Sequence, residues 1–407
     1  MNAIPPTMNL SKLDGLRGIA ATIVIFSHTL FWFLPAVHLG ERTKGRPLDG
    51  IELFNSPFSF FYRGGFSVSM FFILSGLVLT YSISRKSDVL SAIRKSTLKR
   101  YIRLGFPVAI SVLIGCLLMF AGVYEAPDIS PLPVLSAPYS FTPNWLAAIK
   151  DALYGALLFG DSRYNYVLWT IQIELIGSIA VFAGYALCGT NKNIFRIFCV
   201  VTFLALSAST NKLAMYTSLF FLGALLTTVE FSQQSTRARK VLSISGLIFG
   251  LYLAGFHSAS DSYTAITAFT NFISQNFNYA PSWLAIAPAL GGFLIVISIL
   301  SSDSTYSILD SRPMKWLGKL SFSVYLLHTF VLVIAGQFFT KHFGMTLTAL
   351  ALTLSSTLLI TFTLSYFYYK KVDLLSIALA EKFANACITQ KSVAQLPRST
   401  RKVQTEK

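Results

Sequence analysis

Charge is what this sequence lacks most. Only 12% of its 407 residues are charged, against 54% hydrophobic residues, whereas soluble proteins carry roughly 25% charged residues. So few charges cannot cover the surface of a soluble globule of this size. The 35 phenylalanines exclude a disordered chain, and four cysteines are too few for a disulfide-rich secreted scaffold. The class that remains is a membrane protein with many spans.

Several motifs of catalysis and transport are missing as well. The sequence has no Walker A pattern, so ATP-driven transport is unsupported, and it has no HExxH or other histidine spacing typical of a metal site. It also lacks a G-x-S-x-G elbow and a CxxC pair. We therefore expect no metal, and we interpret the cysteines as small apolar residues.

What the chain does have is long apolar runs. A hydrocarbon core about 30 Å thick requires about 20 apolar residues in a helix, and continuous rather than alternating runs favour helices over a barrel. A further apolar stretch, 146–160, carries two charges, and we expect an interfacial or re-entrant helix there. The sequence thus predicts an all-α, polytopic membrane protein with about ten transmembrane helices, at 18–38, 65–84, 104–124, 166–188, 194–210, 213–231, 241–257, 284–301, 320–339 and 345–368.

The basic residues test this arrangement and account for the net charge of +16. With the N-terminus in the cytoplasm, 25 of the 33 lysines and arginines fall on the inside and 8 on the outside. This asymmetry follows the positive-inside rule and predicts that both termini are cytoplasmic. The basic surplus is then mostly topology, and no nucleic-acid partner is needed. We expect one integral membrane domain, 1–370, and a basic cytoplasmic tail, 371–407, that starts helical and is partly disordered.

Ionisable residues inside apolar spans are candidates for function. Arg17 and His28 lie eleven residues apart in the first span, which is about 16 Å of helical rise. Arg17 is then at the cytoplasmic edge and His28 near the middle of the bilayer. Histidine is a suitable general base because its ordinary pKa is about 6.5. The alternative is a histidine that only forms a hydrogen bond to a neighbouring helix.

Two other spans carry such groups. In the fourth, Glu174 needs a partner such as His, Arg or a polar substrate, and Trp169 offers an aromatic platform nearby. In the ninth, Ser321, Tyr325 and His328 share one helix face and would line a polar cavity. Helix packing through an ion pair or interhelical hydrogen bonds is the alternative in both cases.

A basic cluster precedes the third span. Lys99, Arg100 and Arg103 would lie at the inner membrane face, where cations beside a cavity can hold phosphate groups. Anchoring by the positive-inside rule alone is the alternative explanation.

Four motifs, taken in order, resemble acyltransferase family 3, a family of integral membrane enzymes. The segment after the second motif is the basic KRYIRLGFP. The motifs are LDGLRGIAATIVIFSH at 13–28, FSVSMFFILSGLVLTYS at 66–82, LWTIQIEL at 168–175 and WLGKLSFSVYLLH at 316–328.

The resemblance implies transfer of acyl groups, mostly acetyl, from cytoplasmic acyl-CoA to hydroxyls of extracytoplasmic glycans such as O-antigen, exopolysaccharide or peptidoglycan. It implies that His28 is the essential histidine, that Arg17 is its paired arginine, and that Arg100 and Arg103 are linked to CoA binding. Ser69 stands where many members carry an acidic residue, so no carboxylate acts at that position. It also implies the bacterial inner membrane as the location.

These observations together predict a membrane O-acetyltransferase. The basic cluster, Lys99 included, would hold the phosphates of acetyl-CoA, and the pantetheine arm, about 15–20 Å long, would span a distance like that from Arg17 to His28. Glu174, approaching from the outer side, would orient His28 or bind the sugar. Whether His28 acts as a base or is transiently acylated stays open. The residues expected to contact the acceptor are Trp169, Ser321, Tyr325 and His328.

Two other functional classes fit part of the evidence. A transporter or flippase of a polar glycolipid also agrees with ten spans and buried histidine and glutamate, and dependence on acyl-CoA distinguishes it from an enzyme. A proton-coupled sensor or structural subunit would not bind CoA. As an enzyme, the protein is expected to lie in the lipid bilayer. We expect it to act alone, as a homo-oligomer, or with separate glycan-assembly proteins.

Overall fold

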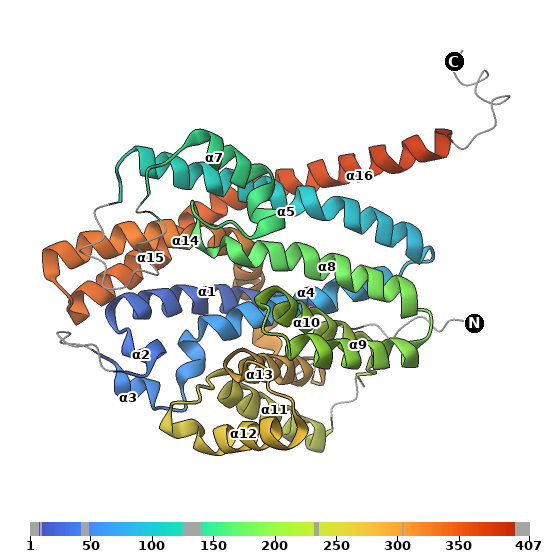
Figure 1. The fold of residues 1–407 in the computed structure, drawn as a ribbon, viewed down its shortest axis with the longest axis horizontal. Coiled ribbons are helices and arrows are strands. Elements are labelled where there is room, and N and C mark those ends of the chain that lie inside the picture. The colour runs from blue at the N-terminus through green and yellow to red at the C-terminus, as the bar shows by residue number, and fades with distance from the viewer. Residues whose placement is uncertain are drawn as a thin grey trace, which may run out of the picture.

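The computed structural model describes residues 8, 10–41, 49–124, 139, 141–231, 236–302 and 305–394. Within these residues the regular structure is helical throughout (Figure 1). Short helical turns, labelled η, connect or extend several helices. The main helices are α1 (Ser11–Phe33), α2 (Ala36–Leu39), α3 (Ile51–Phe54), α4 (Gly64–Ser84), α5 (Val89–Phe120), α7 (Trp145–Lys150), α8 (Trp169–Cys188), α9 (Lys192–Ser207), α10 (Lys212–Leu225), α11 (Arg237–Ala254), α12 (Thr264–Phe277), α13 (Trp283–Leu300), α14 (Arg312–Phe343), α15 (Leu347–Tyr368) and α16 (Leu374–Ala394).

Each of the ten predicted spans falls on a helix. The helices α9 and α10 have only 16 and 14 residues, and α11 begins with three cations in four residues. The count of ten therefore stays a prediction. The part of the chain that the structure describes is helical and contains seven stretches long and apolar enough to cross a bilayer, as expected of a membrane protein. They are Ser11–Phe33, Gly64–Ser84, Val89–Phe120, Tyr166–Cys188, Trp283–Leu300, Arg312–Phe343 and Leu347–Ile388.

The first span ends earlier than the sequence predicted. The prediction was 18–38, whereas α1 ends at Phe33 and Pro35 follows. A residue that precedes proline is disfavoured in the helical conformation, and Leu34 indeed leaves it, with φ −127° and ψ 63°. His38 consequently lies outside the spanning segment, on the short helix α2.

The stretch 146–160, for which an interfacial or re-entrant helix was predicted, forms a helix that packs along α5. It is helix α7 continued by the π-helix η4 (Asp151–Phe159). The Trp145 ring stacks on Phe120 at the end of α5, with centroids 4.9 Å apart, and the Leu153 carbonyl accepts from the Tyr101 hydroxyl in the first half of α5. The segment thus runs back along α5, and α8 starts only after the chain has returned.

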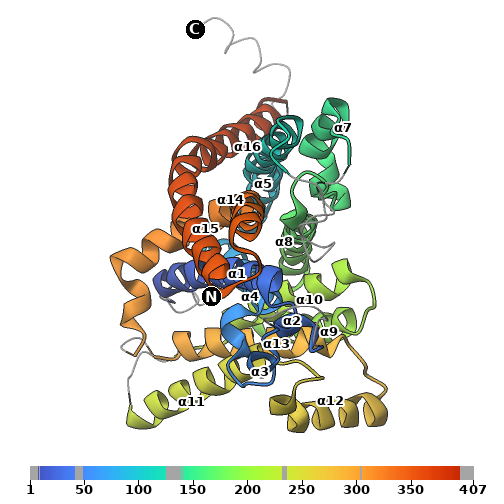
Figure 2. The same cartoon turned by 90° about the vertical axis from the view of Figure 1, so that its left-hand side faces the viewer.

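Helix α1 lies in the middle of the molecule, with α14 and α15 on one side and α13 and α11 on the other (Figure 2). It crosses α14 at glycines. A Cβ atom on Gly18 would lie 2.6 Å from Leu317 Cβ, and one on Gly318 would lie 2.1 Å from the Asp14 carbonyl oxygen. Such close contact through small residues is a common way for helices to pack in membranes. His28 and His328 each lie ten residues beyond this crossing on their own helix.

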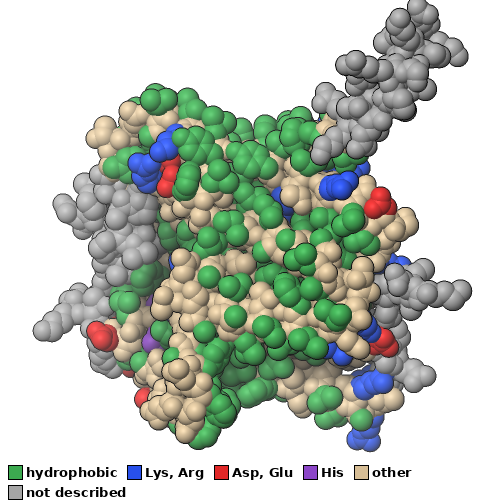
Figure 3. Space-filling model, turned by 45° about the vertical axis from the view of Figure 1, so that its right-hand side comes forward, with side chains coloured by type: hydrophobic (Ala, Val, Ile, Leu, Met, Phe, Trp, Pro, Cys, Tyr) green, Lys and Arg blue, Asp and Glu red, His purple; other side chains and the backbone are tan. Residues whose placement is uncertain are grey.

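Some connections that were predicted on opposite sides of the membrane lie at opposite ends of the molecule. The turns from α4 to α5 and from α8 to α9 lie at the right-hand end of Figure 1, and α2, α3 and the turn from α14 to α15 lie at the left-hand end. The face in Figure 3 shows hydrophobic side chains spread among uncharged polar side chains and backbone, and its charged side chains lie mostly towards the edges. This distribution is expected of a protein whose flank faces lipid.

The predicted tail, 371–407, is helical as far as Ala394, and its disordered part was predicted near the end, at residues outside those described. The described part packs along α5.

Candidate active site

A cavity of about 420 Å³ opens between α1, α4, α5, α8, α14 and the start of α16. Its apolar wall includes Val68, Phe71, Phe72, Leu104 and Ile171. The polar side chains that line it combine four cations with three carboxylates and a few hydroxyl groups. They are Asp14, Arg17, Ser75, Arg100, Arg103, Thr170, Glu174, Lys319, Ser321, Tyr325, Tyr369 and Asp373.

Arg100 and Glu174 form a mostly buried ion pair in this lining. The Arg100 Nη2 atom lies 2.9 Å from Glu174 Oε1, and the two side chains are only 15% and 17% exposed. Arg100 Nε also donates to Ser178 Oγ at 2.9 Å, and Ser75 Oγ donates to Glu174 at 2.9 Å. Glu174 and Ser178 are one helical turn apart on α8, so both face α5. Both side chains of the pair thus have a further polar partner, as burial of charge requires.

Glu174 pairs with an arginine, one of the partners that the sequence allowed for it. It was expected to approach from the outer side and to orient His28 or bind the sugar. In the structure Glu174 lies five residues after Trp169, the first residue of α8, and faces the first half of α5. It contacts Arg100 there, and the contacts of His28 are with other residues.

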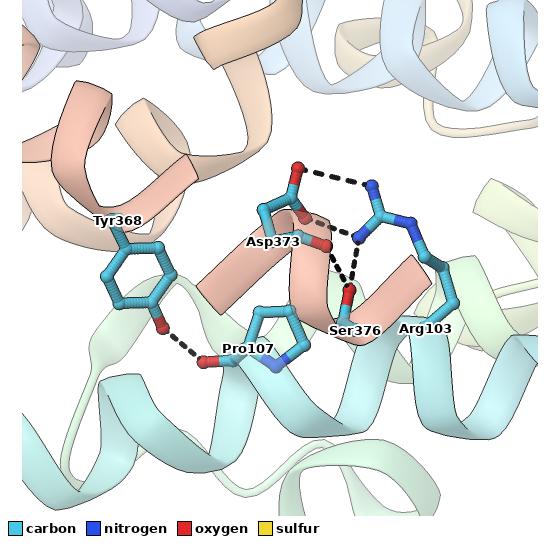
Figure 4. A network of polar contacts seen from close by, with 5 residues as sticks. All are labelled: Arg103, Pro107, Tyr368, Asp373 and Ser376. Carbon is cyan, nitrogen blue, oxygen red and sulfur yellow. Dashed lines mark hydrogen bonds and ion pairs between the residues drawn. The ribbon is translucent and has the colours of Figure 1, made fainter. Parts of the chain in front are cut away.

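Arg103 joins α5 to the π-helix η9 (Tyr369–Asp373) and α16, as Figure 4 shows. Its guanidinium forms an ion pair with Asp373 and donates to Ser376 Oγ at 3.0 Å. Beside it, the Tyr368 hydroxyl donates to the Pro107 carbonyl. The π-helical turn shifts the register of the chain, which brings Asp373 to face the cavity. Asp373 and Ser376 belong to the segment that the sequence interpretation assigned to the tail.

Arg17 and Lys99 differ in their ion pairs and in their position relative to the cavity. Arg17 lies in the cavity lining with Asp14 at 4.0 Å, and it makes no hydrogen bond within the described part of the chain. Lys99 lies outside the cavity, where it and Lys95 both form ion pairs with Glu381 of α16. Of the predicted phosphate ligands, Arg100 and Arg103 line the cavity, and Lys99 does not.

His28 and His328 contact each other deeper in the protein than this cavity, beyond Tyr325 of its lining. His28 Nδ1 lies 2.9 Å from His328 Nε2, and the rings stack with centroids 5.2 Å apart at an angle of 10°. The other ring nitrogen of His28, Nε2, lies 2.5 Å from the Tyr166 hydroxyl. The sequence identified both histidines but not their contact, and it missed Tyr166.

Tyr325 separates the cavity from the histidines. Its hydroxyl donates to the Val167 carbonyl at 3.0 Å and lies 2.9 Å from Thr170 Oγ1, and its ring is 6.0 Å from that of His328. Ser321 and Tyr325 line the cavity as predicted, and His328 follows on the same face. Trp169 does not line it but lies under the ammonium group of Lys212, 3.3 Å from the ring centroid.

Signals for the missed residues were weak. Asp373 is the one carboxylate near the inner end of the last apolar run, in YYKKVD, and its buried position could have suggested an ion pair. Tyr166 is the first residue of the predicted fourth span, three residues before Trp169, where no periodicity predicts its orientation.

Comparison with known proteins agrees with these motifs. The family model described as an acyltransferase domain matches residues 10–366. An O-acetyltransferase of Phomopsis amygdali, PaAT-1, is 24% identical over 91% of this chain and 84% of its own length. Nodulation protein 10 of Rhizobium leguminosarum bv. viciae is 30% identical over 40% of this chain and 41% of its own length. No solved structure shows a significant match. A match over most of the chain, together with the apolar helices, shows that this protein belongs to acyltransferase family 3 and is an integral membrane acyltransferase.

Proposed function

We propose that the protein transfers an acetyl group from cytoplasmic acetyl-CoA to a hydroxyl of an extracytoplasmic sugar or polysaccharide, in a bacterial inner membrane, with His28 as the general base. The observation that carries the proposal is the arrangement of a cation-lined cavity and a histidine pair one behind the other. The name of the Phomopsis amygdali relative supports an O-acetyl transfer.

The cavity suits a CoA thioester. Arg17 and Lys319 are cations in its lining, and arginine and lysine are the residues that bind phosphate in proteins. The apolar wall suits a slender pantetheine arm, which carries few charges. Tyr325 stands between the cavity and His328, so the thioester has to pass beside Tyr325 to reach His28.

The chemistry requires a base, an attacking hydroxyl and a leaving thiolate. His28 takes the proton of the sugar hydroxyl, whose oxygen attacks the thioester carbonyl carbon. The C–S bond breaks, and the CoA thiolate takes the proton back from His28. Donor and acceptor approach from opposite sides of the membrane, which is why the site lies within a membrane protein.

The test is His28→Ala in the full chain, with His342→Ala as the matched control. His342 is an exposed histidine at the far end of α14. We expect His28→Ala to remain folded and to lose transfer of labelled acetyl from acetyl-CoA to surface glycans, followed by mass spectrometry. The control should keep it. Retained acetylation in His28→Ala would overturn the role of His28, and glycan transport without consumption of acetyl-CoA would favour a flippase.

A further inference from the structure

Both ring nitrogens of His328 have hydrogen-bond partners. Its Nδ1 lies 3.1 Å from the Val324 carbonyl oxygen and 2.9 Å from that of Tyr325, both on its own helix. Carbonyl oxygens only accept hydrogen bonds, so Nδ1 must carry the hydrogen. In a neutral imidazole the other nitrogen then has a free lone pair. The Nε2 atom of His328 is therefore an acceptor.

This assignment determines the tautomer of His28. The atom that faces the His328 acceptor is His28 Nδ1, at 2.9 Å, so Nδ1 carries the hydrogen of the His28 ring. The lone pair of His28 is then on Nε2, where the Tyr166 hydroxyl lies at 2.5 Å and donates. A chain of hydrogen bonds thus runs from Tyr166 through both histidines to the backbone of α14.

The burial of the three side chains shows from which end an acceptor can reach this chain of hydrogen bonds. His328 is fully buried, with 0% exposure, while His28 and Tyr166 are both partly exposed. Neither of the latter two lines the cation-bearing cavity. An acceptor hydroxyl can therefore reach His28 only at the Nε2 side, where Tyr166 is now bound, and the Nδ1 side is closed by His328.

We propose that His328 is a positioning residue that fixes the ring of His28 with its basic nitrogen, Nε2, towards the acceptor. This inference rests on the proposed role of His28 as the base, and it replaces the predicted role of His328 as an acceptor-binding residue. Tyr166 marks the position that the acceptor hydroxyl takes when it gives its proton to Nε2. The same logic applies where a buried group on Nδ1 selects the tautomer of a catalytic histidine.

Two substitutions that differ by one methylene separate positioning from packing. In His328→Gln the side-chain oxygen reaches the place of Nε2 and still accepts from His28, whereas in His328→Asn it reaches only the place of Nδ1. We expect His328→Gln to lower kcat by less than about threefold and His328→Asn by roughly ten- to hundredfold. The KM for acetyl-CoA should change in neither, because His328 does not line the cavity.

The pH profile identifies the group that titrates. Glutamine has no proton to lose near neutral pH, so the acid limb of kcat should persist in His328→Gln if it belongs to His28. Equal, wild-type activity in both variants would show that His328 is not needed. Loss of activity in both, with the acid limb gone in His328→Gln, would make His328 the base itself.

A measurement on the unsubstituted protein covers the case in which these variants do not fold. In 15N-histidine-labelled protein, the ring signals of His28 are those that disappear in His28→Ala, and they report which nitrogen carries the hydrogen. A protonated Nδ1 is expected, and a protonated Nε2 would overturn the proposal. This result does not depend on the donor or the acceptor, so it separates a failure of the positioning role from a failure of the proposed function.

Discussion

The cavity and the histidine pair both place polar groups inside an apolar helical bundle, but different interactions stabilise the polar groups in the two regions. In the cavity the groups are ions, and they are balanced by counter-ions, with Arg100 on Glu174 and Arg103 on Asp373. Within the described residues His28 and His328 take part in no ion pair, and neutral rings, a phenol and backbone carbonyls are linked by hydrogen bonds.

This difference predicts how substitutions should affect each region. Removal of one member of a buried ion pair leaves an unbalanced charge, which is costly for the fold. Removal of one member of a neutral chain leaves a single hydrogen bond unmade, which costs far less stability but allows a ring to turn. We expect substitutions in the first region to change stability and donor binding, and those in the second to change the rate.

The largest stability loss is expected for Glu174→Ala. It leaves the guanidinium of Arg100 without its counter-ion in a site where both side chains are mostly buried, and such a change costs about 3–5 kcal/mol. Thermal and denaturant unfolding in detergent would measure it. The double variant Glu174→Gln with Arg100→Gln, which removes both charges, should recover much of this loss. A double variant as unstable as the sum of the single changes would show that the two residues are not coupled.

Substitution of Arg17 should weaken donor binding rather than lower stability. It lacks a close counter-ion, with Asp14 at 4.0 Å, so Arg17→Ala should change stability little. If its guanidinium holds a donor phosphate, the lost charged hydrogen bond is worth about 1.5–3 kcal/mol, and the KM for acetyl-CoA should rise roughly ten- to hundredfold. Arg17→Lys keeps the charge and should recover part of the affinity. An unchanged KM in Arg17→Ala would assign the phosphates to other cations.

A third polar place, outside the spans, adds a pH dependence. Burial and the nearby guanidinium of Arg63 lower the pKa of His38 to about 4, from about 6.5 in an unfolded chain. His38 Nε2 lies 3.1 Å from the Ser27 carbonyl. The folded state favours the neutral ring, so this stability is present above pH 6.5 and is lost as the pH falls towards 4.

Unfolding temperatures measured between pH 7 and pH 4 should therefore fall, and His38→Gln, which still donates to that carbonyl, should flatten the curve. His257 faces Arg63 too, and burial and that cation also lower its pKa to about 4, so part of the slope should survive. The same slope in His38→Gln as in the unsubstituted protein would contradict the assignment.

Much of the fold could be predicted from the sequence because the signals are local. Continuous apolar runs determine where helices form, and the glycines of LDGLRG and WLGKLS occur where α1 and α14 cross. Arg17 and His28 stood out because their helix contains few other polar groups. The charged residues between 146 and 160 predicted a helix other than a span there, and a helix of 15 residues, α7 continued by η4, forms at 145–159.

The partners of these residues could not be predicted, because they depend on the register between helices. The register between α8 and α5 determines whether Glu174 faces His28 or Arg100, and no periodicity in α8 records that register. The π-helical turn that brings Asp373 to Arg103 is equally invisible in the sequence. Tyr166 lies in the 3₁₀ turn η5 (Tyr166–Leu168), where the orientation of a side chain follows from its neighbours in space.

The smallest effect is expected at the rim of the charged region. Glu381 bridges Lys95 and Lys99 but is 43% exposed, and exposed ion pairs contribute little to stability. Glu381→Gln should therefore leave the unfolding temperature nearly unchanged, as should Glu230→Gln, a control at another exposed pair with Lys192. The two variants should differ in donor binding: only Glu381→Gln frees lysines near the cavity, so only it should lower the KM for acetyl-CoA. An equal KM in both would show that Lys95 and Lys99 serve topology and not the donor.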